Sequence, residues 1–133
     1  MPLTTSEHEV KEGILLEYGM RPDILLFINP VGMAFYKGGA RVPYGLIKGA
    51  SDLIGWFIVF GVAVFLAVEL KRPKKGKTSE PQFVFIENVR KAGGCAGIVL
   101  SVAGLQLLLD EYVECRKSGH GLQWHDRTRF VYE

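Results

Sequence analysis

The chain has 133 residues, of which 48% are hydrophobic and 23% charged, and this balance fits one soluble globular domain over residues 1–133. The formal net charge of +2 excludes a global basic field of the kind that draws nucleic acid to a whole protein surface. Cys95 and Cys115 lack the CxxC spacing of zinc sites, and the first residues lack the apolar core of a signal peptide. We therefore expect a cytoplasmic protein in a reducing setting.

The first predicted elements are a helix and a short strand. "TTSEHEVKEGILLEYG" (residues 4–19) is typical of a helix, with Thr5 or Ser6 as its cap, acidic residues in its first turn and Gly19 at its end. "DILLFIN" (residues 23–29) is predicted to be a buried strand. Residues 31–51 are rich in glycine, basic and aromatic residues, and connections of that length are often functional.

The apolar run at residues 53–70 has two interpretations. Its length suits a membrane-spanning helix, and Lys and Arg follow it as they follow a span on the cytoplasmic side. However, Glu69 lies within its apolar end, its Val, Ile, Phe and Trp content suits strands, and Gly61 stands near its middle. We therefore predict two strands joined by a turn at residues 59–62 and no membrane association. A small membrane protein anchored by residues 53–70 is the weaker alternative.

The second half of the chain is predicted to contain a helix, a strand and another helix. Ser79 can cap the first helix, which Gly93 and Gly94 close. "CAGIVLSV" (residues 95–102) is a buried strand, and "GLQLLLDEYVECRKSG" (residues 104–119) is an amphipathic helix. The tail is a candidate for an extra strand. The order α-β-β-β-α-β-α predicts an α/β protein with a mixed β-sheet flanked by helices.

Charged residues gather at the open end of the predicted hairpin. Glu69 and Lys71 face the same side of their strand, and a turn at residues 59–62 brings Asp52 alongside Glu69. Two carboxylates at such a short distance repel each other unless a cation compensates their negative charge. Mg²⁺ is typically held by one or two carboxylates together with water and phosphate. This pattern indicates phosphodiester hydrolysis, in which the metal activates water and Lys71 stabilises charge on the phosphate. The simpler interpretation is a salt bridge at a strand end.

Three segments together resemble a known nuclease family. "GASDLIGW", "AVELKRPKKGKTSEPQ" and "VRKAGGCAGIVLSV" look like the VRR-NUC family (viral-type replication and repair nucleases) of the PD-(D/E)XK superfamily. The resemblance covers nearly the whole chain and implies a restriction-endonuclease-like fold. It further implies a DNA-repair endonuclease that uses Mg²⁺ or Mn²⁺ and hydrolyses branched DNA such as four-way (Holliday) junctions. Its stand-alone members are of phage or bacterial type, so the expected setting is the cytoplasm of a bacterial or phage-infected cell.

The resemblance assigns roles to individual residues. Asp52 and Glu69 match the metal-binding carboxylates, although Ser51 stands where the superfamily has proline. Lys71 matches the catalytic lysine, and Gln82 matches a helix glutamine that supports the metal site or contacts phosphate.

The assignment of the helix glutamate is less specific. Glu7 has the spacing that suits the family best, while Glu9 and Glu12 stay open as alternatives.

Basic and aromatic residues in two segments are expected to contact the DNA backbone and to position it without reading sequence. Five of the seven residues from 71 to 77 are basic, although a solvated loop is the simpler interpretation. Asn29 is a further candidate, with turn formation as its alternative role. The expected DNA-binding residues are Lys37, Arg41, Tyr44, Lys48, Arg72, Lys74, Lys75 and Lys77.

A homodimer is the expected assembly. A four-way junction has near two-fold symmetry and needs two matched cuts, which a two-fold dimer supplies. Leu105, Leu108 and Leu109 of the last helix are the residues offered to a partner, unless they only cover the chain's own sheet. The main rival to the nuclease is a non-catalytic DNA-binding module of the same fold.

Overall fold

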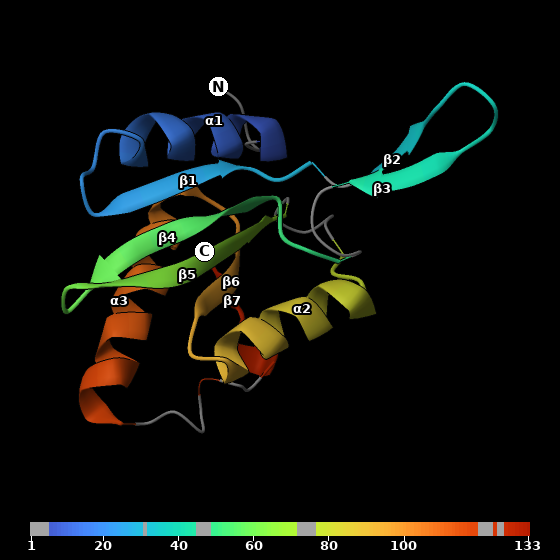
Figure 1. Cartoon of the computed structure of the whole chain (residues 1–133). Coiled ribbons are helices and arrows are strands. Elements are labelled where there is room, and N and C mark those ends of the chain that lie inside the picture. The colour runs from blue at the N-terminus through green and yellow to red at the C-terminus, as the bar shows by residue number, and fades with distance from the viewer. Residues whose placement is uncertain (1–5, 31, 45–48, 72–76, 120–123, 125–126) are drawn as a thin grey trace.

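The computed structural model describes residues 6–30, 32–44, 49–71, 77–119, 124 and 127–133 (Figure 1). These residues form the expected mixed α/β fold, in which three α-helices accompany a five-stranded mixed sheet. In chain order the elements are α1 (Glu7–Tyr18), β1 (Ile24–Ile28), β2 (Gly32–Phe35), β3 (Arg41–Tyr44), β4 (Leu53–Val59), β5 (Val62–Leu70), α2 (Glu80–Lys91), β6 (Cys95–Val99), α3 (Val102–Ser118), the 3₁₀ turn η2 (Arg127–Arg129) and β7 (Val131–Tyr132).

The five-stranded sheet has the strand order β1-β4-β5-β6-β7. The pairs β1–β4 and β4–β5 are antiparallel, whereas β5–β6 and β6–β7 are parallel. The parallel pair β5–β6 is joined through α2, as a parallel connection requires. The extra strand predicted in the tail is β7.

The apolar run at residues 53–70 is the predicted hairpin. Val59 pairs with Val62, so Phe60 and Gly61 form a two-residue turn. Both have positive φ, 50° at Phe60 and 78° at Gly61, which is the backbone of a type I′ turn and matches the twist of the flanking strands. Within the described ranges, no helix is long and apolar enough to cross a membrane.

The two faces of the sheet bury different sets of side chains, because successive residues of a strand point to opposite faces. On one face, Ile14 of α1 and Leu105 of α3 share a core with Leu66 of β5. On the other, Ile86 of α2 packs in a second core with Ala67 of β5. Figure 1 shows α2 on the opposite side of the sheet from α3.

The leucines of the last helix do not form a surface for a partner. Leu105 and Leu108 are completely buried and Leu109 is 3% exposed, all within the core shared by α1, α3 and the sheet. The expectation that they contact a second copy is therefore wrong. An amphipathic pattern marks which face of a helix is apolar, but the chain's own sheet covers that face here.

The segment predicted as a connection contains a further two-stranded ribbon. β2 and β3 pair with each other in antiparallel register, with Phe35 opposite Arg41, and they form a separate sheet. Phe35, Tyr36 and Val42 are exposed. The sequences of the two strands, GMAF and RVPY, lack the regular alternation of apolar and polar residues by which a strand is recognised in a sequence.

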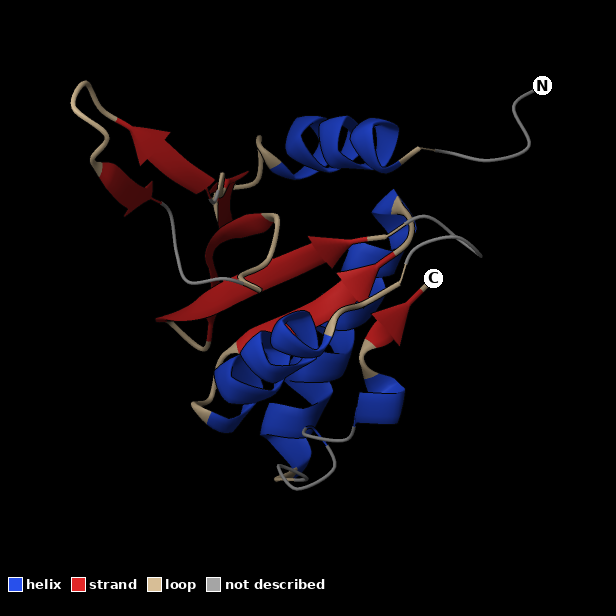
Figure 2. Cartoon of the chain, turned by 90° about the vertical axis from the view of Figure 1, so that its right-hand side faces the viewer, coloured by secondary structure: helices blue, strands red, loops and turns tan. Residues whose placement is uncertain are grey.

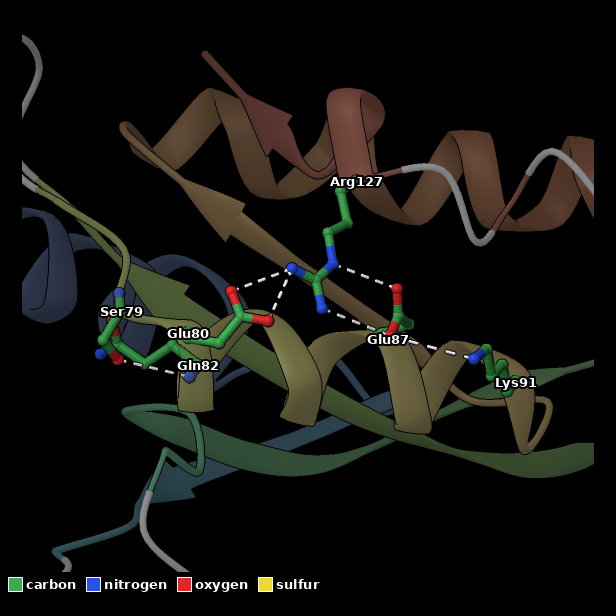
Figure 3. Close-up of polar contacts among 6 residues, drawn as sticks. All are labelled: Ser79, Glu80, Gln82, Glu87, Lys91 and Arg127. Carbon is green, nitrogen blue, oxygen red and sulfur yellow. Dashed lines mark hydrogen bonds and ion pairs between the residues drawn. The ribbon is translucent and has the colours of Figure 1, made fainter.

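The C-terminal segment is fixed to the body by two arginines. The buried guanidinium of Arg90 donates to the carbonyl oxygens of Ala96 at 2.7 Å and Trp124 at 2.8 Å, and it lies 3.6 Å from the centre of the Trp124 ring. Arg127 binds α2 from outside, at Glu80 and Glu87 (Figure 3). These contacts bring the end of the chain against α2 and β6.

Candidate active site

Asp52 and Glu69 meet at one end of the β4–β5 hairpin. Leu53 pairs with Val68, so Asp52, one residue before β4, stands opposite Glu69 near the end of β5. The backbone N–H of Leu70 donates a hydrogen bond to Asp52 Oδ2 at 2.9 Å, which fixes the aspartate against the neighbouring strand. The juxtaposition expected from the hairpin is therefore present.

Glu69 is a buried carboxylate with one unsatisfied oxygen. Its residue is 2% exposed, and Oε1 accepts a hydrogen bond from Gln82 Nε2 at 2.9 Å. Oε2 is buried, and no donor from the described part of the chain reaches it. Burial first, and then the neighbouring carboxylate of Asp52, raise the pKa of Glu69 to about 8 against the opposing effect of Lys71. The site thus disfavours two negative charges unless a cation joins them.

The two carboxylates fit a hard divalent cation. An orphaned, buried carboxylate oxygen beside a second carboxylate is a donor set that Mg²⁺ or Mn²⁺ would satisfy. No group of three or more His, Cys, Asp or Glu able to hold a metal is found among the described residues. Asp52 and Glu69 would therefore leave several positions on the cation for water and substrate oxygens, as Mg²⁺ sites usually do.

Lys71 lies beside the carboxylates at the end of β5. Its Nζ is 3.6 Å from Glu69 Oε1, and its side chain is only 15% exposed. Its backbone N–H donates to Val99 O at 3.3 Å, so the parallel strand β6 holds the residue after the end of β5. A confined ammonium offers a compact positive charge with three N–H donors, which is the chemistry that binds an anionic group.

Gln82 connects the start of α2 to Glu69. Its Oε1 accepts from the backbone N–H of Ser79 at 2.9 Å, and Ser79 Oγ accepts from the backbone N–H of Gln82 at 3.4 Å, which is a capping box (Figure 3). The capping box fixes the amide so that its Nε2 points at Glu69. Gln82 is therefore not a freely solvated helix residue.

A cavity of about 280 Å³ lies beside Asp52, and the three candidate glutamates of α1 differ in their position relative to it. Glu7 lines it together with Asp52 and Leu70. Glu9 accepts a hydrogen bond from Ser6 Oγ, and Glu12 pairs with His8 at 3.1 Å on an exposed face. The structure thus places Glu7 in the cavity beside Asp52, whereas its two alternatives have local partners on α1.

Three further residues at the site were not predicted in these positions. His8 and Lys11 line the cavity with Glu7, and the four-residue spacing of Glu7 and Lys11 on one helix was the available signal.

The Asn29 amide donates to Ser51 O at 3.2 Å, and its backbone N–H donates to Asp52 O at 2.9 Å. Asn29 thereby positions the Asp52 backbone. Only the β1–β4 pairing brings it there, so its sequence neighbours carry no signal.

Three of the eight expected DNA-binding residues have described side chains, and all three are exposed. Lys37 and Arg41 lie on the β2–β3 ribbon, and Lys77 lies before α2. The backbone of Tyr44 closes the ribbon opposite Gly32. The remaining four lie outside the described residues: Lys48, Arg72, Lys74 and Lys75.

Comparison with known proteins assigns no family. No protein-family model matches the chain, and a search of curated proteins gives no significant match.

Proposed function

We propose that this protein is a metal-dependent, structure-selective DNA endonuclease that hydrolyses phosphodiester bonds. The observation that carries the proposal is the Asp52–Glu69 pair, in which a buried carboxylate oxygen lacks a donor and a lysine ammonium lies 3.6 Å from Glu69. Such a pair disfavours its own double negative charge, and a divalent cation is its natural complement. The resemblance to the VRR-NUC nucleases supports the same reaction.

The order of elements supports the restriction-endonuclease-like fold that this resemblance implies. A helix, an antiparallel β1–β4–β5 meander, the crossover helix α2 and the parallel strand β6 follow one another around the site. The β2–β3 ribbon is inserted between the first two strands of the meander, and β7 extends the far edge.

The chemistry divides among the residues of the site. Asp52 and Glu69 would hold Mg²⁺ or Mn²⁺, which lowers the pKa of water and polarises the phosphate. The Lys71 ammonium would stabilise negative charge that develops on the phosphate oxygens. Gln82 would keep Glu69 oriented toward the cation, since its amide already donates to Oε1. Glu7 would complete the rim of the cavity beside Asp52.

The proposed substrate is branched DNA, with four-way junctions preferred over linear duplex, and the proposed assembly is a homodimer. Two identical sites about a two-fold axis would make matched cuts on opposing strands of a junction. Phosphate contacts from the basic residues would position the DNA without reading its sequence.

The deciding experiment is cleavage of a panel of linear, flapped and four-way DNA in Mg²⁺ or Mn²⁺, with EDTA as the blank. An Asp52→Asn variant is the control, because it removes a metal ligand and keeps the shape of the side chain. Metal-dependent products from the wild type but not from the variant are expected. Binding without any cleavage by the wild type would instead indicate a non-catalytic DNA-binding module.

A further inference from the structure

The β2–β3 ribbon projects from the body of the protein. Figures 1 and 2 show the two strands extending away from the sheet and from the helices. Its tip is an ordered turn, in which Tyr36 N–H donates to Ala40 O at 2.8 Å and Gly39 N–H donates to Tyr36 O at 3.1 Å. A lone two-stranded ribbon is marginally stable in water, so this one is an unusual feature to maintain as a simple connection.

Large aromatic side chains are exposed at the end of this ribbon. Phe35 is 74% exposed and Tyr36 is 57% exposed, and they adjoin the exposed Lys37. Arg41 stands opposite Phe35 in the ribbon and is exposed too. The tip thus combines two aromatic rings with two cations within a few residues.

The charge of this segment selects the kind of partner. Between Asp23 and Asp52 the sequence contains no acidic residue, while Lys37, Arg41 and Lys48 are basic. A uniformly positive segment is complementary to a polyanion. Aromatic rings beside cations are the combination by which proteins bind unpaired nucleotides, because every base has a face that can stack and every nucleotide carries a phosphate.

The base of the ribbon is joined to the candidate active site. β1 precedes the ribbon and β4 follows it, and the Asn29–Asp52 backbone hydrogen bond of 2.9 Å closes the gap between these strands. Phe35 and Tyr36 lie six and seven residues beyond Asn29, so the chain can separate them from the Asp52 backbone by at most about 20–25 Å. That upper bound equals about six to seven base pairs of duplex, so DNA bound at the carboxylates can also reach the tip.

We propose that Phe35 and Tyr36 at the tip of the β2–β3 ribbon stack on unpaired bases of branched DNA, while Lys37 and Arg41 contact the adjacent phosphates. This inference rests on the proposed endonuclease function and names the feature of the substrate that the protein selects. Fully paired linear duplex offers no free base face, so it gains only the phosphate contacts.

The test measures binding rather than cleavage. Fluorescence anisotropy in EDTA compares a linear duplex with the same duplex carrying three unpaired nucleotides at a fork, for the wild type and for Phe35→Ala/Tyr36→Ala. Each stacked base contributes about 5- to 150-fold in affinity, so the variant that lacks both rings is expected to bind forked DNA at least about 30-fold more weakly. Its affinity for linear duplex is expected to change less than about twofold, since both lysine and arginine remain.

Two controls separate stacking from general apolar contact. Phe60→Ala removes another exposed aromatic, 65% exposed in the turn at the far end of β4, and is expected to bind forked DNA like the wild type. Phe35→Trp is expected to retain fork binding, whereas Phe35→Leu keeps apolar bulk without an aromatic face and is expected to lose it. Equal binding by the leucine and tryptophan variants, or an equal loss on linear and forked DNA, would overturn the inference.

The outcomes also distinguish this inference from the proposed function. If the wild type never cleaves DNA but the double variant loses fork selectivity, the endonuclease fails and the stacking inference stands. If the wild type cleaves DNA and the double variant binds forked DNA as tightly as the wild type, the endonuclease proposal stands and the stacking inference fails. Loss of binding to anionic phospholipid vesicles in the double variant, with DNA binding unaffected, would assign the tip to a lipid surface and overturn the inference.

Discussion

Glu69 is the residue whose substitution is expected to affect the candidate active site most. Glu69→Gln is expected to abolish metal-dependent cleavage while leaving DNA binding largely intact. The neutral amide has no charge to desolvate and no repulsion from Asp52, so the free energy of unfolding without metal is expected to hold or rise. Cleavage of a four-way junction and thermal unfolding in EDTA measure the two effects. Cleavage at the wild-type rate would exclude Glu69 from the metal site.

The raised pKa of Glu69 makes stability depend on pH in the metal-free protein. The folded state, with a pKa of about 8, keeps a proton that the unfolded chain releases near the usual value of 4.5. Because the native state binds more protons in this window, stability is expected to fall as pH rises from about 4.5 to about 8. Urea unfolding in EDTA across this range tests the slope. Glu69→Gln is the control and is expected to lack this contribution.

Lys71 and Lys77 stand on either side of the basic segment and test different roles. Lys71→Ala is expected to slow cleavage by about 10²–10³-fold, the range for losing one group that stabilises a transition-state charge. Lys71→Arg is expected to restore activity only in part, because a planar guanidinium does not replace a compact ammonium. Lys77→Ala is expected to weaken binding and reduce its salt dependence instead. Single-turnover rates and salt titrations separate the two, and identical behaviour would remove Lys71 from the chemistry.

At the scale of the element, α2 performs two tasks through one side chain. The amide of Gln82 completes the capping box with Ser79 and also donates to Glu69. Ser79→Ala removes the cap alone and is expected to lower the free energy of unfolding by about 1 kcal/mol with little change in cleavage. Gln82→Ala is expected to cost a similar amount and also to slow cleavage, because Glu69 loses its donor. Denaturant unfolding and cleavage rates on both variants check this, and equal cleavage rates would confine Gln82 to capping.

At the scale of the whole molecule, burial of the α3 leucines removes the surface first expected for a dimer. A different apolar row crosses three strands on the open part of the sheet, where Leu25 pairs with Trp56 and Trp56 pairs with Phe65. These side chains are 44%, 43% and 42% exposed, respectively. We propose this contiguous, uncharged row as the contact between the two copies of the proposed homodimer, because large exposed apolar patches are typical of interaction sites.

Trp56→Lys is therefore expected to convert a homodimer to a monomer. Leu107→Lys is the matched control, because Leu107 is 53% exposed on α3 and lies outside the row, so this variant is expected to remain dimeric. Light scattering at micromolar concentration measures the oligomeric state of each protein, and circular dichroism verifies that the variants are folded. A wild-type protein that is monomeric at these concentrations would contradict the proposed assembly.

Elements whose signals are local can be predicted from the sequence alone. The β4–β5 hairpin follows from an apolar run with Gly61 near its middle, and the turn position fixes the register that sets Asp52 opposite Glu69. Ser79 was identified as a cap because a hydroxyl before a helix satisfies its free N–H groups. Turn chemistry and capping act over a few residues, so a single sequence contains them.

Which surfaces are covered, and which side chains meet across the chain, depends instead on how the whole chain packs. The leucine face of α3 would be apolar whether a partner or the chain's own sheet covered it. The sheet buries it here, because residues of α1, α3 and β5 form one core. The choice of Glu7 over Glu9 and Glu12 depends on how α1 lies beside Asp52. The partners of Arg90 come from β6 and the C-terminal segment. Apart from the Arg90–Ala96 hydrogen bond, these contacts join residues far apart in sequence, and packing of the whole chain sets such distances, which no local pattern records.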